Sequence, residues 1–581
     1  MRLFFLDIEL PAELHQFKLE TLQKLNFGSN EPTSDKHHIP PGGEPIVDED
    51  DIEDPTFDGV STPSSDGSGP GSPQTYSSSS ISFSSTFETT IPHGATIHGF
   101  TIFDNLVVHN GTFYLVTNDP SGFPKKAHIA AKPHPGDWGD RDPNPEDFHF
   151  ITPEELVPLL GDSAIRIQGS SWILYDVWQF MRHFYHWWGE IILGGWRVWS
   201  LLGVDSTGSF HPEWLQLPDR FLLPMVADGK WRDRPQMVGS LMRAAFPNAA
   251  IEERDQWLDL TRLNSTVVFD RALIINRRAA HAHPWGGRWS KMIAGTQELQ
   301  APEFSPESSS PSNEGFWSPI RKTLTHNTLG YLPTFASLTD RRIISPPSDK
   351  SELPLVTYID RQGTGRRLTE ESHKSLVDAL SELEAEGVCE IKIVRMENVP
   401  LREQIRLAAR SAVSFGVLLY HGDPEVAKAY SYRLSLRSPG AHKNNRLIPV
   451  HGSLFHIMAH TERREMRKTE PMAEIMVGVH GNGLTHQLWM PPSARSTIIE
   501  IVIPGAYPFD YEMLARNMGH KHYMAWNDTL ITYAKGTYHQ KVNFPDDFHS
   551  SHIYVHGPAV AQKIKERLLG TERDDAEKVD L

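Results

Sequence analysis

The alternation of hydrophobic and polar positions first becomes regular near residue 91. The segment "ATIHGFTIFDNLVVHNGTFYLVTND" has the two-residue period of β-strands joined by an Asn-Gly turn. A helical period follows in "YDVWQFMRHFYHWWGEIILGGWRVWSLLG". We expect strands in "RFLLPMVA" and "STVVFDRALIINR" and a helix in "DRPQMVGSLMRAAFP". This order of elements predicts an α/β domain over residues 93–345.

A second set of elements alternates more strictly. Strands are expected in "LPLVTYIDR", "EIKIVRM", "EIMVGVHG", "STIIEIVIP" and "HKHYMAW". The helices between them are expected in "TEESHKSLVDALSELEAEG", which has a threonine N-cap, and in "PLREQIRLAARSA", "LTHQLWM" and "PFDYEMLARNMG". This β-α-β-α order predicts a parallel, doubly wound sheet over residues 346–570. Two such α/β units in tandem are typical of a two-domain enzyme with a cleft between the domains.

Three segments lack either period. Residues 1–92 are mostly rich in serine, glycine, proline and acids, which predicts a disordered linker or stem. Residues 413–473 are basic and separate a helix from the strand expected a few residues later, so we interpret them as an insertion. Because Val413-Ser414 can be encoded by GTGAGT, a common intron start, this insertion is hypothesised to be a retained intron. Residues 571–581 form an acidic tail.

The composition narrows the class of function. The 581 residues carry a formal net charge of −17, which argues against a protein that coats nucleic-acid phosphates. The single cysteine, Cys389, excludes an internal disulfide and a thiolate zinc site and is expected in the core. No clear signal peptide or apolar run long enough to cross a membrane is evident. Three glycosylation sequons, at Asn110, Asn264 and Asn527, are about as many as chance would place.

The turn "VGVHGNGLTH" follows an expected buried strand. In open parallel sheets, ligands bind beyond the carboxyl ends of the strands, and the first turn of a helix attracts phosphate. Glycines allow a tight turn, free N–H groups point outward, and the histidines can donate to phosphate or sugar oxygens. A plain strand-to-helix turn is the alternative. The residues expected to contact an anion are His480, Gly481, Gly483, Leu484, Thr485 and His486.

Two further segments suggest donor contacts. In "DRQGTGRRL", Arg361, Arg366 and Arg367 cluster with two glycines, and their guanidinium groups suit diphosphate oxygens, with a solvated basic turn as the alternative. Arg361 and Arg366 are the candidate donor contacts. Glu500 lies within an apolar strand, where a carboxylate must be paired or bound. It could accept hydrogen bonds from ribose hydroxyls, or it could pair with a nearby arginine.

The helical segment "HFYHWWGEIILGGW" supplies a candidate general base. His186 and Glu190 are four residues apart and so share one helix face, where the carboxylate can orient the imidazole. The alternative is a core helix with a structural His–Glu hydrogen bond. The same spacing would also suit a metal, but no third ligand lies in an evident motif.

Taken together, these segments resemble glycosyltransferase family 61, and fungal members most. The segment "GVHGNGLTHQLWMPP" with "TIIEI" resembles the family signature, "YIDRQGTGRRL" its arginine-rich turn, "EQIRLAA" its next helix and "FYHWWGE" its acceptor-side motif. The resemblance covers roughly residues 96–570. Two departures stand out: Thr369 and Glu370 replace an asparagine frequent in the family, and residues 413–473 interrupt a stretch that the family runs through almost directly.

The resemblance implies a GT-B-like fold, in which two Rossmann-like doubly wound domains face a cleft. It implies an inverting transferase that moves a sugar from a nucleotide-sugar, expected to be a UDP-sugar, to a glycan or glycoprotein hydroxyl. No other cofactor, no metal ion and no nucleic acid are expected. Family members work in the secretory pathway, in the Golgi or endoplasmic reticulum lumen, and membrane association would need an anchor not evident here. The alternatives are an inactive carbohydrate- or nucleotide-sugar-binding protein and a metal-dependent hydrolase.

Overall fold

The structure is a computed structural model that describes residues 80–131, 147–304, 315–330, 353–409, 473–534 and 537–572. All of these residues belong to one compact unit, Ser79–Leu581. The expected stem up to residue 79, residues 410–472 with the suspected insertion, and residues 573–581 of the acidic tail lie outside the described part. The described chain forms two β-sheets covered by helices, which confirms the expected mixed α/β class.

The first sheet combines both strand directions. Its order is β5-β4-β3-β9-β6-β7-β8, with β1 paired to β6 and β2 to β3. The strand β3 is antiparallel to β4 and β9, whereas β9, β6, β7 and β8 run parallel. Its strands are β1 (Ser80–Ser82), β2 (Thr96–Ile97), β3 (Phe100–His109), β4 (Thr112–Val116), β5 (Phe148–Ile151), β6 (Ser163–Leu174), β7 (Arg220–Leu222), β8 (Ala250–Glu252) and β9 (Thr266–Ile275). Because β1 pairs with β6, this fold extends upstream of residue 93, where the domain was expected to begin.

The Asn-Gly turn sits where the sequence predicts it. Asn110 and Gly111 join β3 to β4 with φ values of 49° and 83°. Positive φ at both central residues is what a two-residue hairpin with right-handed strand twist requires. The predicted hairpin is therefore confirmed.

The long helical segment that follows is broken into pieces. It contains α4 (Trp178–Met181), a π-helix, η3 (His186–Ile192), and α5 (Leu193–Trp199). The remaining helices around the first sheet are α2 (Lys126–Ile129), α3 (Pro153–Leu160), α6 (Met237–Ala245), α7 (Arg254–Arg262), α8 (Arg277–His281), α9 (Pro284–Trp289) and α10 (Ser318–Leu329). Short 3-10 turns are η1 (Pro92–Gly94), η2 (Pro120–Gly122), η4 (Ser200–Gly203), η5 (Pro212–Trp214) and η6 (Gly295–Glu298).

The second sheet follows the predicted parallel pattern. Its order is β11-β10-β12-β13-β14-β15, and all strands but β15 run parallel. The strands are β10 (Leu355–Ile359), β11 (Glu390–Val394), β12 (Ala473–Val479), β13 (Thr497–Ile501), β14 (Lys521–Trp526) and β15 (Thr529–Ile531). The helices are α11 (Glu370–Ala385), α12 (Leu401–Ala409), α15 (Asp510–Met518) and α16 (Gly557–Leu569), with 3-10 turns η9 (Met396–Asn398) and η10 (Asn482–Trp489).

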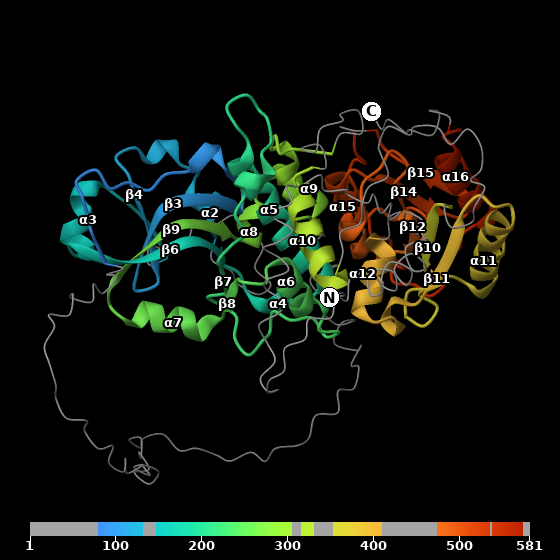
Figure 1. Cartoon of the computed structure of the whole chain (residues 1–581), viewed down its shortest axis with the longest axis horizontal. Coiled ribbons are helices and arrows are strands. Elements are labelled where there is room, and N and C mark those ends of the chain that lie inside the picture. Colours follow the sequence, from blue (N-terminus) through green and yellow to red (C-terminus); the bar gives the residue numbers. More distant parts are fainter. Residues whose placement is uncertain are drawn as a thin grey trace, which may run out of the picture. The chain divides into compact units, whose positions relative to one another are not determined.

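Helices cover both faces of this second sheet (Figure 1). On one face, Val477, Ile499 and Tyr523 form a buried cluster with residues of α11 and α16, and Cys389 belongs to it, as expected. On the other face, Met476 and Ile498 join the largest core of the molecule. Because strand side chains alternate between faces, Glu500 points to the same side as Ile498. This acid therefore lies beneath the elements that carry the candidate site.

The two sheets share that largest core. Trp317 Nε1 donates to the carbonyl oxygen of Leu488 at 2.9 Å, and Arg197 Nη1 donates to Asn517 Oδ1 at 2.9 Å. The Trp188 and Trp489 rings meet edge-to-face with centroids 5.1 Å apart. Helix α10 contacts both α6 and α12, so elements of the two sheets pack directly against each other.

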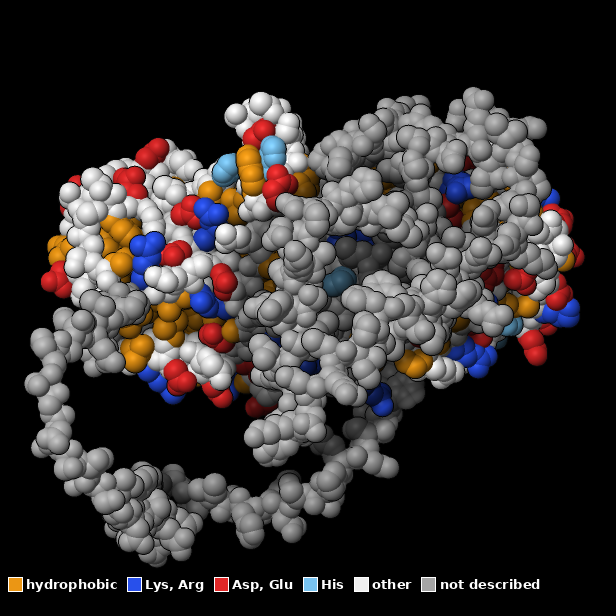
Figure 2. Space-filling model, viewed as in Figure 1, with side chains coloured by type: hydrophobic (Ala, Val, Ile, Leu, Met, Phe, Trp, Pro, Cys, Tyr) orange, Lys and Arg blue, Asp and Glu red, His pale blue; other side chains and the backbone are white. Residues whose placement is uncertain are grey.

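One face of the described surface mixes basic and acidic side chains (Figure 2). On the face in Figure 2, basic, acidic and apolar side chains are interspersed over the described part of the surface. None of the helices that the structure describes combines the length and apolar character that a bilayer crossing needs.

Candidate functional site

The candidate site begins where β12 ends and the chain turns into η10. A Cβ atom added to Gly481 would overlap the Arg361 guanidinium, and one added to Gly483 would lie 2.8 Å from Ile359 Cγ2. These two glycines let side chains from the end of β10 lie against the turn. The turn is thus built for close approach at the carboxyl edge of the sheet, where parallel sheets bind ligands.

Two arginines converge on the backbone of this turn. Both Arg361 Nη1 and Arg366 Nη1 donate to the carbonyl oxygen of His480, the second at 3.0 Å. Burial lowers the pKa of both guanidinium groups, and the positive charge of Arg361 lowers that of Arg366 further. Within the described ranges, neither forms an ion pair with a carboxylate. A bound anion would offset this cost of burying positive charge.

Glu500 holds two histidines rather than facing open space. His480 Nδ1 lies 2.5 Å from Glu500 Oε1, and His522 Nε2 lies 2.9 Å from Oε2. The Glu500 side chain is fully buried, and both oxygens are occupied. The expected hydrogen bonds to ribose are therefore not available to Glu500 in this arrangement, and its partners are histidines rather than the arginine that was the alternative. His522 was not singled out from the sequence.

The charge on Glu500 makes folding stability depend on pH. Burial alone would raise its pKa, but hydrogen bonds from His480 and His522 hold it at about 2. A depressed carboxyl pKa stabilises the fold above the ordinary value near 4.5, and this contribution is lost as pH falls toward 2. We expect the difference in unfolding free energy between the wild type and Glu500→Gln to shrink by about 3 kcal/mol between pH 7 and pH 2.

Urea unfolding of both proteins at several pH values in this range measures the effect. The comparison isolates Glu500, because the other carboxylates titrate in both proteins. A difference that stays constant down to pH 2 would contradict the assignment of a charged, doubly bonded Glu500.

The second part of the site comes from the elements around the first sheet. His186 Nδ1 lies 2.6 Å from Glu190 Oε2, so the expected His–Glu pair is confirmed, although its helix is a π-helix. Arg277 Nη1 donates to the same oxygen at 2.7 Å, and the Met292 amide donates to Oε1 at 3.2 Å. The Glu190 side chain is 1% exposed, so this carboxylate is held from three sides.

Electrostatics separates the roles of the pair. Burial would raise the Glu190 pKa, but the positive charge of Arg277 and the hydrogen bond from His186 hold it well below its usual range. Burial lowers the pKa of His186 despite the nearby carboxylate. The arrangement therefore favours a neutral imidazole with its proton on Nδ1 and its lone pair on Nε2, which is the form of a general base.

Arg277 and Asp176 are site residues that the sequence interpretation missed. They follow the ends of the parallel strands β9 and β6, and the Arg277 amide donates to Asp176 Oδ2 at 3.3 Å. The Arg277 guanidinium also lies over the Phe180 ring at 4.2 Å. Polar residues directly after two apolar strands, "ILYD" and "IINR", were the available signal, because such ends meet at one edge of a sheet.

A cavity of about 550 Å³ brings the two parts together. Its walls include His183 and Phe184 from one sheet's elements and Arg361, Gly483 and His486 from the other's. His183 lies next to the base candidate, with its ring centroid 4.9 Å from that of His186. The cavity therefore lies between Arg361 and His183, the residue that adjoins the His–Glu pair.

The residues of η10 divide between cavity and core. His486 lines the cavity, burial lowers its pKa to about 4, and its Nδ1 has no hydrogen-bond partner in the described chain. Leu484 and Thr485 are fully buried, and the Leu484 amide donates to the Gly481 carbonyl at 3.0 Å. The expectation that the Leu484 amide points at an anion is therefore wrong, because the 3-10 turn uses that amide itself.

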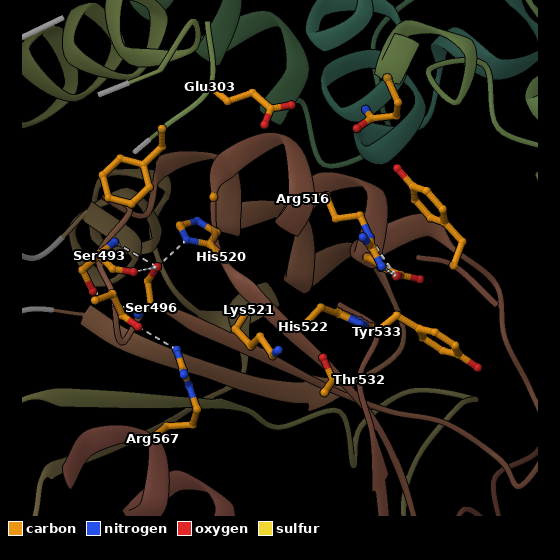
Figure 3. A pocket seen from close by; sticks show the side chains of 16 residues that line it. Glu303, Ser493, Ser496, Arg516, His520, Lys521, His522, Thr532, Tyr533 and Arg567 are labelled. Carbon is orange, nitrogen blue, oxygen red and sulfur yellow. Dashed lines mark hydrogen bonds and ion pairs between the residues drawn. The ribbon is translucent and has the colours of Figure 1, made fainter. Parts of the chain in front are cut away.

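A second cavity, of about 620 Å³, lies at the amino ends of β13 and β14 (Figure 3). Its cations already have partners: Arg516 pairs with Glu512, and Arg567 donates to Thr497 Oγ1 at 3.0 Å and pairs with Glu572 at 2.9 Å. Asp233 and Glu397 also line the first cavity, but its Arg361 forms no ion pair with a carboxylate of the described chain, so we take the first cavity as the candidate for an anionic ligand.

Neither a metal site in the described part of the chain nor a match to a known protein identifies the function of this site. Among the described residues, no group of three or more His, Cys, Asp or Glu side chains is arranged to hold a metal ion. No family model and no curated protein matches the sequence, so the site's function is argued from its geometry and from the motifs.

Proposed function

We propose that the protein is an inverting glycosyltransferase that transfers a sugar from a UDP-sugar to a hydroxyl of a glycan or glycoprotein. One observation carries the proposal: Arg361 lines a cavity whose opposite wall includes His183, the neighbour of the His186–Glu190 pair. Arg366 donates to the same His480 carbonyl as Arg361, and neither arginine has a carboxylate partner in the described chain. A transferase needs both an acceptor for leaving-group charge and a base for the attacking hydroxyl. A GT-B-like domain arrangement is part of the same proposal.

In the proposed reaction, His186 Nε2 takes the proton of the acceptor hydroxyl as its oxygen attacks the anomeric carbon. The bond from that carbon to the diphosphate oxygen breaks, and the new glycosidic bond forms on the opposite face, which inverts the configuration. The guanidinium groups of Arg361 and Arg366 stabilise the negative charge that develops on the leaving diphosphate. Glu190 orients the imidazole and stabilises its protonated form, as carboxylates do for other catalytic histidines.

Release of UDP is the decisive experiment. The full chain is incubated with UDP-xylose, UDP-N-acetylglucosamine and other UDP-sugars, with and without glycan acceptors, and UDP is measured. Acceptor-dependent release supports the transferase. Binding of UDP in a thermal-shift titration without any release would indicate a non-catalytic binding protein. No UDP binding, together with a hydrolysis activity that EDTA abolishes, would overturn the proposal in favour of a hydrolase.

Replacing Arg361 with methionine is expected to weaken UDP binding and to lower the transfer rate by about 10²-fold, because a preorganised charge at the diphosphate is removed. The fold should persist, since Arg366 still donates to the His480 carbonyl. Isothermal titration with UDP and the UDP-release assay measure the two effects. The exposed neighbour Arg367 provides a matched control in Arg367→Met, which should behave as the wild type. Equal activity of the two variants would contradict the role given to Arg361.

A location in the secretory pathway belongs to the proposal as well. The three sequon asparagines, Asn110, Asn264 and Asn527, are exposed and have positive φ, which allows modification, and Asn110 donates to Asn264 Oδ1 at 3.1 Å. Peptide-N-glycosidase treatment of the protein from its native cells tests this location. A loss of apparent mass on a gel supports the location, and an unchanged band argues against it.

A further inference from the structure

A polar groove crosses the middle of the first sheet, away from the candidate active site. It has a volume of about 490 Å³, and its floor carries Asp104 of β3, Arg166 of β6 and Arg271 of β9. The nearest site residue along the chain, Arg277 at the start of α8, is six positions from Arg271 of β9, which is roughly 20 Å for an extended chain. The groove is therefore a separate feature of the fold.

The floor of the groove is polar but has no excess charge. Arg271 donates through Nε and Nη2 to the two Asp104 oxygens at 2.6 and 2.9 Å, and Arg166 Nε donates to Asp270. The side chains of Arg271 and its partner Asp104 are 38% and 26% exposed. Those of Arg166 and its partner Asp270 are 44% and 25% exposed. Two cations and two anions cancel, so this surface offers hydrogen bonds to a ligand without attracting phosphate or another charged group.

An exposed indole stands at the edge of this floor. Trp214, in η5, lines the groove and is 53% exposed, whereas most tryptophans of the described chain are buried. The His211 ring stacks on one face of the indole, with centroids 4.0 Å apart and planes at 13°. The exposed half is therefore the other face and its edges. An apolar plane held rigidly beside fixed polar groups is typical of a binding site rather than of ordinary surface.

A β-bulge in β6 forms part of the groove wall. The pairing of β6 with β9 shifts register between Ile167 and Ser170, and Gly169 within the shift has a φ of 79°. The Gly169 amide donates to Asp270 Oδ2 at 3.2 Å, and a Cβ atom added there would overlap Asp219. Asp219 itself accepts from the Ser170 amide at 2.7 Å. Such bulges redirect side chains at functional positions, and here the bulge forms part of the groove wall.

We infer that this groove binds a neutral oligosaccharide. A sugar ring has an apolar face of C–H groups, which packs on the open face of Trp214, and a rim of hydroxyls. Those hydroxyls can donate to Asp104 and Asp270 and accept from the guanidinium N–H groups that the two ion pairs do not use. The inference does not depend on sugar transfer, because a binding protein without turnover would use the groove in the same way.

Calorimetric titration of the full chain with xylohexaose, cellohexaose and chitohexaose tests the inference. At least one neutral hexasaccharide should bind, with an affinity that is insensitive to salt, and oligogalacturonate should not bind. Trp214→Ala should weaken binding by about tenfold, since it removes the stacking surface. The control Tyr554→Ala removes an aromatic side chain that is also 53% exposed but lines none of the cavities described, and should change nothing.

Three results would overturn the inference: no binding of any neutral hexasaccharide at millimolar concentration, stronger binding of oligogalacturonate, or wild-type affinity in Trp214→Ala. Asp270→Asn is a second variant, because it keeps the shape of the groove but weakens an acceptor. The UDP thermal shift, measured on the same variants, shows that they are folded. The groove proposal and the transferase proposal can fail separately. A protein that releases no UDP can still bind sugar in the groove, and a protein whose groove binds no sugar can still release UDP.

Discussion

Replacing His186 with alanine is expected to slow sugar transfer by about 10²–10⁴-fold while UDP binding is unchanged, because general base catalysis contributes this much. Glu190, Arg277 and Met292 fix this imidazole through hydrogen bonds that lead back to the His186 ring. Burial lowers the pKa of the ring and so favours its neutral form, which is the form that the proposed base needs in order to accept a proton. The rate of UDP release at saturating donor and acceptor measures the loss.

The variant is distinguished from a damaged fold in two ways. UDP affinity, which we propose to depend on Arg361 and Arg366, should stay within error of the wild type. His326→Ala serves as the matched control, since His326 is exposed on α10 and does not line the cavity. An active His186→Ala enzyme would remove this residue from the reaction and leave its neighbour His183, on the cavity wall, as the next candidate.

Replacing Arg277 with methionine is expected to lower the free energy of unfolding by about 3–5 kcal/mol and to abolish transfer. Glu190 is 1% exposed and remains ionised because Arg277 and His186 stabilise its charge. Loss of one partner from a buried pair leaves an uncompensated charge, which is the costly case. The Glu190 pKa would then rise, and the carboxylate would no longer hold His186 in a defined orientation. Urea unfolding and UDP release measure the two consequences.

A double-mutant cycle sharpens this test. Glu190→Gln combined with Arg277→Met removes both charges, so the double variant should be less destabilised than the sum of the single variants. Lys374→Met breaks an exposed pair with Asp378 and should cost less than about 1 kcal/mol. Additive effects of the two site variants would mean that Glu190 and Arg277 do not act as a pair.

Much of the second sheet could be predicted from the sequence, although β15 and α16 were not expected. The strands β10 and β13 are fully buried, so they appear as short apolar runs, and α11 begins at a threonine cap. Thr369 caps α11 by accepting from the Ser372 amide at 3.2 Å, as the capping pattern indicates. The glycines of the turn after β12 also have the close contacts that their pattern predicts. Sequence patterns within each short segment were enough to predict these elements, because strands and helices alternate along this part of the chain.

The first sheet and the pairings within the site were harder to predict. Strand β3 also pairs antiparallel with β9, more than 150 residues further along the chain, and such a pairing between distant segments leaves no periodic signal in the sequence. The partners of Glu500 are 20 and 22 residues away, and those of Glu190 include Arg277, 87 residues away. Only the His186–Glu190 pair is local enough for its four-residue spacing to reveal it.

The shared core between the two sheets has a kinetic consequence. Many enzymes with two α/β domains admit substrate by swinging the domains about a hinge, which requires an interface that can separate at low cost. Here buried contacts of Trp317, Trp188 and Arg197 with Leu488, Trp489 and Asn517 join elements of the two sheets. Separation would expose large aromatic surfaces and leave a buried guanidinium without its partners. Ligand exchange is therefore expected to proceed through the mouth of a preformed cavity, with rates governed by the side chains around that mouth rather than by movement of whole domains.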